Sequence, residues 1–138
     1  MARIICIDYG GKRTGIAVTD PLQIIATPLT TIPTQTLFSF LKEYIAKEPV
    51  ELILIGEPYN LDQTVTHATP LVLKAIEQLK KYFPQIPVKT VDEQYTSKMA
   101  SRAMVEMGMK KKQRRIKENI DQIAATIMLQ TYLQERAM

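Results

Sequence analysis

The sequence has no tryptophan, one cysteine and one histidine among its 138 residues. A single cysteine excludes an intrachain disulfide, and the first residues have no apolar region of a signal peptide, so we expect a cytoplasmic protein. No apolar run approaches the roughly 18–20 residues that cross a membrane, and no membrane partner is expected. His67 stands alone among polar residues, which disfavours a catalytic or metal site built on histidine.

Aromatic side chains are few, with six tyrosines and three phenylalanines spread along the chain. Proteins that bind single strands of nucleic acid usually offer aromatic stacking platforms. If the protein binds nucleic acid, this composition favours recognition of the backbone of a shaped RNA or a duplex over base-by-base reading.

Positive charge is concentrated in one place. The chain has 18 Lys and Arg against 14 Asp and Glu, and six of those cations are Lys110, Lys111, Lys112, Arg114, Arg115 and Lys117. Without these six, 12 cations stand against 14 acids, a balance of −2. Such a segment is a candidate for binding phosphate backbones, with a solvated loop that has no partner as the alternative.

Apolar periodicity predicts one domain over residues 1–138. The expected strands are Arg3–Asp8, Thr14–Asp20, Ile24–Thr31, Glu51–Gly56 and Val88–Asp92. Helices are expected over Gln35–Lys47, from Pro70 to about Lys80, from Thr96 or Ser97 to Met107, and over Lys117–Arg136. The order predicts an α/β fold with a five-stranded mixed sheet, an antiparallel meander of three strands plus two parallel strands, flanked by helices.

Helix ends and faces follow from the same patterns. Thr34 is the expected cap of the first helix. Two shared faces are predicted: Leu37, Leu41, Tyr44 and Ile45 in the first helix, and Ile120, Ile123, Ala124, Ile127 and Thr131 in the last. In the second helix, Leu73, Ile76, Leu79 and Lys80 continue the helical pattern that begins at Pro70.

Acidic residues follow the expected parallel strands. Asp8, Glu57 and the pair Asp92–Glu93 come at strand ends, where open α/β sheets bind ligands, and Asp121 flanks the apolar face of the last helix. Carboxylates that converge repel one another unless cations lie between them. Two divalent cations such as Mg²⁺ can activate water and stabilise the leaving oxygen of a phosphodiester. A solvated carboxylate or a strand-end cap remains the alternative for each acid alone.

Several motifs resemble one known family. The opening D-Y-G-G-K-R-T-G-I-A-V-T-D (Asp8–Asp20), I-G-E-P-Y-N (Ile55–Asn60), V-D-E-Q-Y-T-S (Val91–Ser97) and the final I-D-Q-I-A-A-T-I-M-L-Q-T-Y-L (Ile120–Leu133) are similar to the YqgF/RuvX family, which is related to the Holliday-junction resolvase RuvC. The resemblance covers essentially the whole chain. It implies an RNase H-like fold and a metal-dependent nuclease linked to maturation of the 5′ end of small-subunit ribosomal RNA.

Carried over by motif, the acidic triad of that family falls on Asp8, Glu93 and Asp121, which would hold Mg²⁺ or Mn²⁺. Arg13 and the basic segment would hold the nucleic-acid backbone. Two positions depart from the family pattern. Gln94 stands where an arginine is usual, and Glu57 adds a carboxylate that would supplement or compete with Glu93.

The expected substrate is precursor rRNA, with the assembling small ribosomal subunit as a further candidate partner. Branched DNA is the alternative substrate, and a nucleic-acid-binding module without catalysis is the alternative function. The Asp-x-Gly opening also resembles the phosphate loop of ATPases and sugar kinases. Those enzymes close two domains around the nucleotide, whereas this chain has the length of one domain, so this class is disfavoured. A monomer and a homodimer both remain open.

Overall fold

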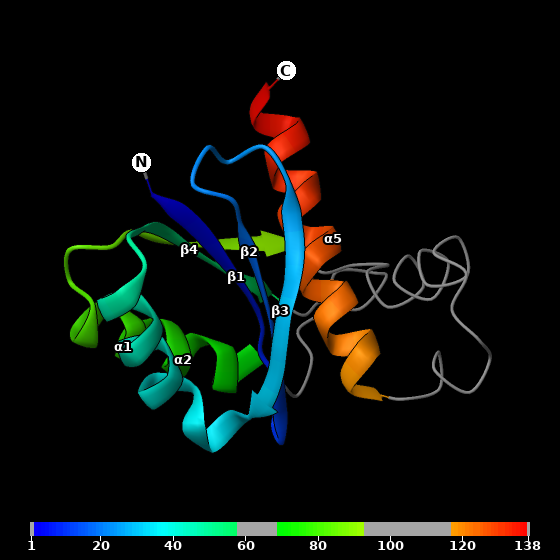
Figure 1. Ribbon diagram of the computed structural model, residues 1–138. Helices are drawn as coiled ribbons and strands as arrows, with labels where there is room; N and C mark the ends of the chain where they lie inside the picture. The colour runs from blue at the N-terminus through cyan, green and yellow to red at the C-terminus, as the bar shows by residue number, and fades with distance from the viewer. Residues whose placement is uncertain (1, 58–68, 93–116, 138) are drawn as a thin grey trace.

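Five strands form one mixed sheet with helices on both of its faces (Figure 1). The computed structural model describes residues 2–57, 69–92 and 117–137. The strands are β1 (Arg3–Asp8), β2 (Arg13–Thr19), β3 (Ala26–Pro33), β4 (Val50–Glu57) and β5 (Val88–Asp92). The helices are α1 (Leu37–Lys47), which follows the 3-10 turn η1 (Thr34–Thr36), α2 (Thr69–Tyr82) and α5 (Lys117–Ala137).

The sheet has the strand order β3-β2-β1-β4-β5. β1 is antiparallel to β2, and β2 is antiparallel to β3, which makes the expected meander. β4 is parallel to β1 on its other side, and β5 is parallel to β4. The mixed α/β sheet predicted from the sequence is therefore confirmed. The helix expected from Thr96 or Ser97 to Met107 lies outside the described residues.

Alternation of side chains divides the apolar interior into two clusters, one on each face of the sheet. The first cluster joins Ile5 and Ile7 of β1 to buried side chains of α1 and α2. The second cluster joins Ile4 and Cys6 of the same strand to α5. Cys6 is fully buried, as expected for a small core residue.

Helix α1 buries Leu37 and Leu41, with Tyr44 and Ile45 partly buried beside them, as the pattern predicted. The prediction for Thr34 was wrong. It belongs to η1 rather than to an α-helical N-terminus, and its hydroxyl makes no capping bond but turns to the β1–β2 turn.

Helix α2 is present as predicted and packs on the same face of the sheet as α1. Its buried residues are Val72, Ala75 and Leu79, whereas Leu73 is about half exposed. Because Ala75 is small, the helix face that contains Val72, Ala75 and Leu79 can pack closely against the sheet.

Helix α5 crosses the opposite face, over β1, β2 and β3. Ile123 and Ala124 are buried as predicted, but Ile127 and Thr131 of the predicted face are only partly buried. The buried face instead continues through Ala125 and Leu129, which are both fully buried. None of the described helices is both long and apolar enough to span a membrane.

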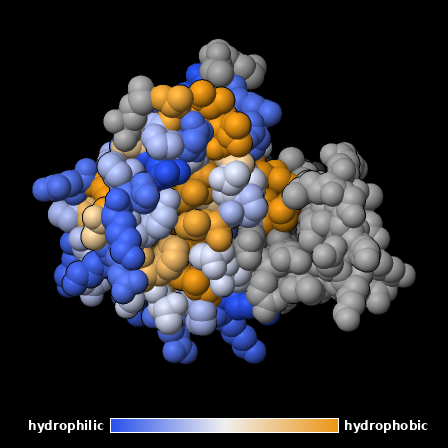
Figure 2. Space-filling model, viewed as in Figure 1, coloured by the Kyte–Doolittle hydropathy of each residue, from blue (hydrophilic) through white to orange (hydrophobic). Residues whose placement is uncertain are grey.

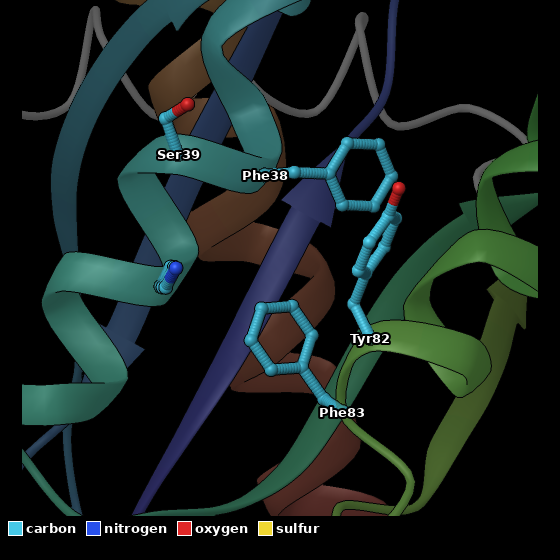
Figure 3. A pocket seen from close by; sticks show the side chains of 5 residues that line it. Phe38, Ser39, Tyr82 and Phe83 are labelled. Atoms are coloured by element: carbon cyan, nitrogen blue, oxygen red, sulfur yellow. The ribbon is translucent and has the colours of Figure 1, made fainter.

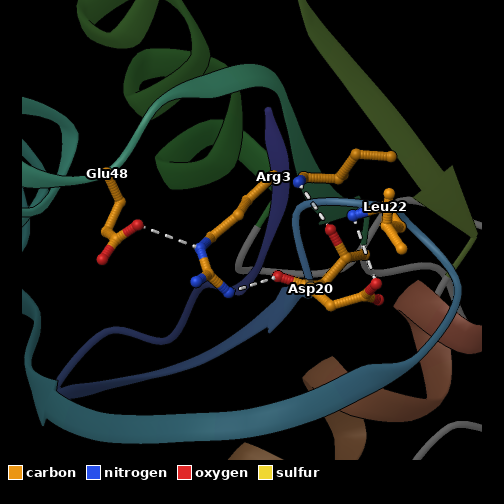
Figure 4. A network of polar contacts seen from close by, with 6 residues as sticks. Arg3, Asp20, Leu22 and Glu48 are labelled. Carbon is orange, nitrogen blue, oxygen red and sulfur yellow. Dashed lines mark hydrogen bonds and ion pairs between the residues drawn. The ribbon is translucent and has the colours of Figure 1, made fainter. Parts of the chain in front are cut away.

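The sheet edge where β1 begins is joined by polar contacts (Figure 4). Arg3 pairs with Glu48 at 3.3 Å and donates to the carbonyl of Thr19 at 3.0 Å. The Thr19 hydroxyl accepts from the backbone N–H of Ile4 at 2.9 Å, which explains how a fully buried threonine is tolerated there.

Asp20 organises the β2–β3 turn, as the Asp20–Pro21 pair predicted. Its carboxylate accepts backbone N–H groups from Leu22, Ile24 and Ile25 (Figure 4 draws the first). Two of these amides belong to residues expected to begin the third strand. Because the turn uses them, β3 starts at Ala26 rather than at Ile24.

Apolar side chains remain exposed over this turn and along β3 (Figure 2). Leu22, Ile24 and Ile25 are each more than half exposed. β3 is an edge strand, and Pro28 and Pro33 deprive it of two backbone donors, which limits pairing with another strand.

Candidate functional site

Three parallel strands end together at one edge of the sheet. Ile7 pairs with Ile55, and Glu57 pairs with Asp92. Asp8, the last residue of β1, is therefore level with the ends of β4 and β5. Neighbouring strands lie about 4.8 Å apart, so the three strand ends span roughly 10 Å. The sequence prediction that acidic residues follow these strands to one edge is confirmed for the backbones of Asp8, Glu57 and Asp92.

Asp8 lies on the face of the sheet that α5 covers. Ile4 and Cys6 belong to the cluster on the α5 face, and Asp8 follows Cys6 by two residues. Since residues two apart in a strand share a face, the Asp8 carboxylate projects to the same side. Asp8 is half-buried at the point where the core ends.

Helix α5 begins at this same end of the molecule (Figure 1). Asp121 lies in its second turn, one helical turn before Ala125, which is fully buried against the sheet. Ala124 and Ala125 are small, so the helix backbone can lie close to the strands.

A tight turn connects Asp8 to Arg13. A Cβ atom on Gly10 would lie 2.3 Å from the backbone oxygen of Arg13, so only glycine fits there, whereas a Cβ atom on Gly11 meets nothing within 4 Å. Lys12 is exposed, and Arg13 begins β2 as a half-buried residue. Two cations thus follow the candidate carboxylate within five residues.

Thr34 holds this turn from the end of β3. Its hydroxyl donates to the Gly10 carbonyl at 2.6 Å, and its backbone N–H donates to the Lys12 carbonyl at 2.9 Å. The Thr14 hydroxyl lies 2.8 Å from the Thr34 hydroxyl. The sequence does not predict this arrangement, because a threonine before a helix is typical of a cap and no local pattern indicates a contact across 24 residues.

The remaining predicted site residues are only partly covered. Glu93, Lys110, Lys111, Lys112, Arg114 and Arg115 lie outside the described residues, as does His67. Lys117 is the first residue of α5, and Glu57 is the last of β4. Within residues 2–57, 69–92 and 117–137, no three His, Cys, Asp or Glu side chains group closely enough to bind a metal ion.

A separate groove lies between α1 and α2, on the face away from α5 (Figure 3). Its volume is about 440 Å³, and its lining comprises Phe38, Ser39, Lys42, Tyr82 and Phe83. Phe38 and Tyr82 pack with ring centroids 5.4 Å apart. Aromatic residues that are scattered in the sequence therefore gather in space, but no predicted site residue lines this groove.

Comparisons with known proteins agree with the fold. The profile of the family RuvX, described as Holliday junction resolvase, matches residues 2–135. A protein of Bacteroides thetaiotaomicron is 51% identical over 136 residues and one of Flavobacterium johnsoniae is 52% identical over 136 residues, each covering 99% of both chains. Both relatives carry the name "Putative pre-16S rRNA nuclease".

One solved structure is similar over nearly the whole chain. It is titled "T. thermophilus RuvC in complex with Holliday junction substrate" and aligns with a TM-score of 0.59 at 16% identity, covering 99% of this chain and 96% of that chain. At this identity the likeness shows the fold alone, and it confirms the expected RNase H-like arrangement.

Proposed function

Because the chain belongs to the RuvX family, we propose that it is a nuclease that hydrolyses phosphodiester bonds of structured nucleic acid, with the 5′ end of precursor 16S rRNA as its substrate. The observation that carries the proposal is the position of Asp8. It ends β1 on the face that α5 covers and is level with the ends of β4 and β5. Helix α5, which contains Asp121, begins at the same end of the molecule (Figure 1). The names of the relatives support the choice of RNA.

Asp8, Glu93 and Asp121 would hold Mg²⁺ or Mn²⁺, and Glu57 is a further candidate ligand. Carboxylate oxygens are the ligands that these hard cations prefer. The half-buried position of Asp8, at the boundary between core and solvent, suits a ligand that faces both a cation and a substrate phosphate. When bound, such cations activate water and stabilise the leaving oxygen of a phosphodiester.

The chain's own residues bind and orient the substrate. The β1–β2 turn fixes the backbone directly after Asp8 and leads to Lys12, which is exposed, and Arg13, which is half-buried. Arg13 and the basic residues Lys110, Lys111, Lys112, Arg114, Arg115 and Lys117 would bind the phosphate backbone. Such binding depends on salt and on the shape of the nucleic acid, and it needs no aromatic platform at the site.

Resolution of branched DNA is the second candidate. The description of the family and the shared fold with RuvC, whose structure is of a complex with Holliday junction substrate, both favour it. A resolvase needs two sites facing symmetric strands, so this candidate requires a stable dimer, whereas processing of one rRNA end is compatible with a monomer.

The decisive experiment compares Asp8→Asn with Glu51→Gln. Glu51 is an exposed carboxylate near the start of β4, at the opposite edge of the sheet, so its removal controls for the loss of one negative charge. Each protein is incubated with precursor 16S rRNA and with a four-way DNA junction in Mg²⁺ or Mn²⁺. Its melting temperature is also titrated with Mn²⁺.

We expect the wild type and Glu51→Gln to cleave the precursor RNA and to be stabilised by Mn²⁺. Asp8→Asn should lose both properties while it still binds the RNA. Equal cleavage by Asp8→Asn and wild type would refute the assignment of Asp8. Binding without cleavage in the wild type would favour the non-catalytic module, and junction cleavage by a dimer would favour the resolvase.

A further inference from the structure

The Thr34 hydroxyl donates its only proton to a backbone carbonyl. A carbonyl oxygen can only accept, so the 2.6 Å contact with Gly10 uses the single O–H of Thr34 as the donor. The 2.8 Å contact between the hydroxyls of Thr14 and Thr34 must then have Thr14 as the donor. The result is a chain of two hydrogen bonds in which Thr14 donates to Thr34 and Thr34 donates to the carbonyl of Gly10.

Thr34 makes hydrogen bonds to two backbone carbonyls of the β1–β2 turn. The Gly10 carbonyl accepts from the hydroxyl of Thr34, and the Lys12 carbonyl accepts from its N–H at 2.9 Å. Thr14 is fully buried, so its side chain has no freedom to exchange this partner for bulk water. The same turn is already closed tightly, with no room for a side chain on Gly10.

The hydroxyl of Thr34 is not needed by the helix that follows. Neither η1 nor α1 has a capping bond from a side chain. Thr36, two residues on, uses its hydroxyl locally, on the Pro33 carbonyl at 2.8 Å. Thr34 instead reaches back to a turn whose two ends are Asp8 and Arg13.

We propose that Thr14 and Thr34 are positioning residues that fix the β1–β2 turn and thereby the orientation of Asp8 and Arg13 for phosphodiester hydrolysis. The inference rests on the proposed nuclease function. Neither threonine touches substrate in this account, and both act through the backbone of residues 9–13. A displacement of about 1 Å in a group that positions a reaction can reduce its rate about 100-fold, so loss of one hydroxyl is expected to be visible in kcat.

The test uses Thr34→Val, which keeps the shape and the backbone N–H but removes the hydroxyl, and Thr34→Ser, which restores it. Thr27→Val is the matched control, because the hydroxyl of Thr27 also bonds a backbone carbonyl, that of Val18 at 3.2 Å. Thr27 lies on β3 near the opposite end of its pairing with β2, far from the β1–β2 turn. Each full-length variant is measured for kcat and KM on the precursor RNA and for amide hydrogen exchange at residues 9–13.

We expect Thr34→Val to lower kcat at least 10-fold with KM changed less than about twofold, and to speed exchange in residues 9–13. Thr34→Ser should restore both, and Thr27→Val should match the wild type. Because the two threonines act in one chain, Thr14→Val with Thr34→Val should lose no more activity than Thr34→Val alone. If Thr34→Val folds poorly, Thr14→Val tests the same hydrogen-bond chain one step earlier: it leaves the bond from Thr34 to Gly10 but removes the partner that orients the Thr34 hydroxyl, so the same effects are expected with a smaller size.

Equal kcat and equal exchange in Thr34→Val and Thr27→Val would overturn the proposal. So would a Thr34→Ser variant that exchanges slowly but stays as inactive as Thr34→Val. Failure of the nuclease function has a different signature, because the wild type would then cleave neither substrate. The exchange of residues 9–13 would still show whether Thr34 holds the turn.

Discussion

Replacement of Gly10 by alanine is expected to damage the site out of proportion to the size of the change. The new Cβ atom would lie 2.3 Å from the backbone oxygen of Arg13, whereas ordinary contacts begin at 3.4 Å, so the turn must open by about 1 Å. The obstacle is backbone rather than a flexible side chain, so the strain cannot be relieved by a rotamer change.

Two effects follow from that opening. Forced overpacking costs about 1–3 kcal/mol, which lowers the melting temperature of a domain of this size by roughly 3–15 °C. A shift of about 1 Å in the turn between Asp8 and Arg13 should also reduce kcat about 100-fold. The measurements are a thermal melt and cleavage of precursor rRNA under saturating Mn²⁺.

Gly11→Ala is the matched control, one residue further along. Its Cβ atom meets nothing within 4 Å, and neither glycine has a φ between +20° and +160°. We expect wild-type cleavage and a stability that is unchanged or higher by up to about 1 kcal/mol, because alanine restricts the unfolded chain. If Gly10→Ala and Gly11→Ala behave alike in both assays, the close approach of Gly10 to Arg13 does not constrain the site and the reasoning is refuted.

Three further changes test other parts of the molecule. Leu129→Ala removes a fully buried side chain and should lower the free energy of unfolding, measured with urea, by about 2–5 kcal/mol. Leu71→Ala, at a residue about half exposed, should change it by no more than about 0.5 kcal/mol. Equal losses would contradict the assigned core. Hydrogen bonds from the backbone of Ile25, and also of Ile24 and Leu22, hold the pKa of Asp20 below its ordinary 3.8. The ionised Asp20 carboxylate therefore stabilises the folded protein fully above about pH 4, and this stabilisation is lost as the pH falls further. The melting temperature of Asp20→Asn should therefore fall less between pH 5 and pH 3 than that of the wild type, and an identical pH profile would count against this turn. The double variant Arg114→Gln, Arg115→Gln should reduce the slope of log Kd for RNA against log salt concentration by roughly 1.4–1.8. The control Lys80→Gln, Lys81→Gln should leave this slope unchanged. The reverse pattern would place the RNA on α2.

The strands were predictable because their signal is local. Arg3–Asp8 and Val88–Asp92 were located to the residue, since buried parallel strands are short apolar runs between polar residues. The start of β3 was not predictable in this way. Ile24 and Ile25 have strand-like side chains, but a carboxylate four and five residues earlier captures their amides.

The buried face of α5 was less predictable than that of α1, because alanine adds little to an apolar pattern. The buried stripe of α5 runs through Ala125, and a reading weighted toward large side chains turns the helix toward Ile127 instead. The packing distance between helix and sheet decides the face, and only the assembled structure contains it.

The site was predictable as far as its edge of the sheet. Strand order and direction bring Asp8 level with the ends of β4 and β5, and the helix that contains Asp121 begins beside them. The roles of Asp8, Glu93, Asp121 and the basic segment stay predictions. The support of the β1–β2 turn by Thr34 was beyond sequence reasoning, since it depends on a contact between segments 24 residues apart.

The division of the apolar interior by the sheet has a consequence for how the molecule loses activity. The cluster under α1 and α2 and the cluster under α5 share strands but, in the described chain, no helix. A local opening that releases α5 therefore breaks only one of the two clusters and leaves β1 and β4 joined to the other. Such an opening would carry Asp121 away from Asp8 while much of the protein is still folded, so heat or mild denaturant should inactivate the enzyme before its overall structure melts.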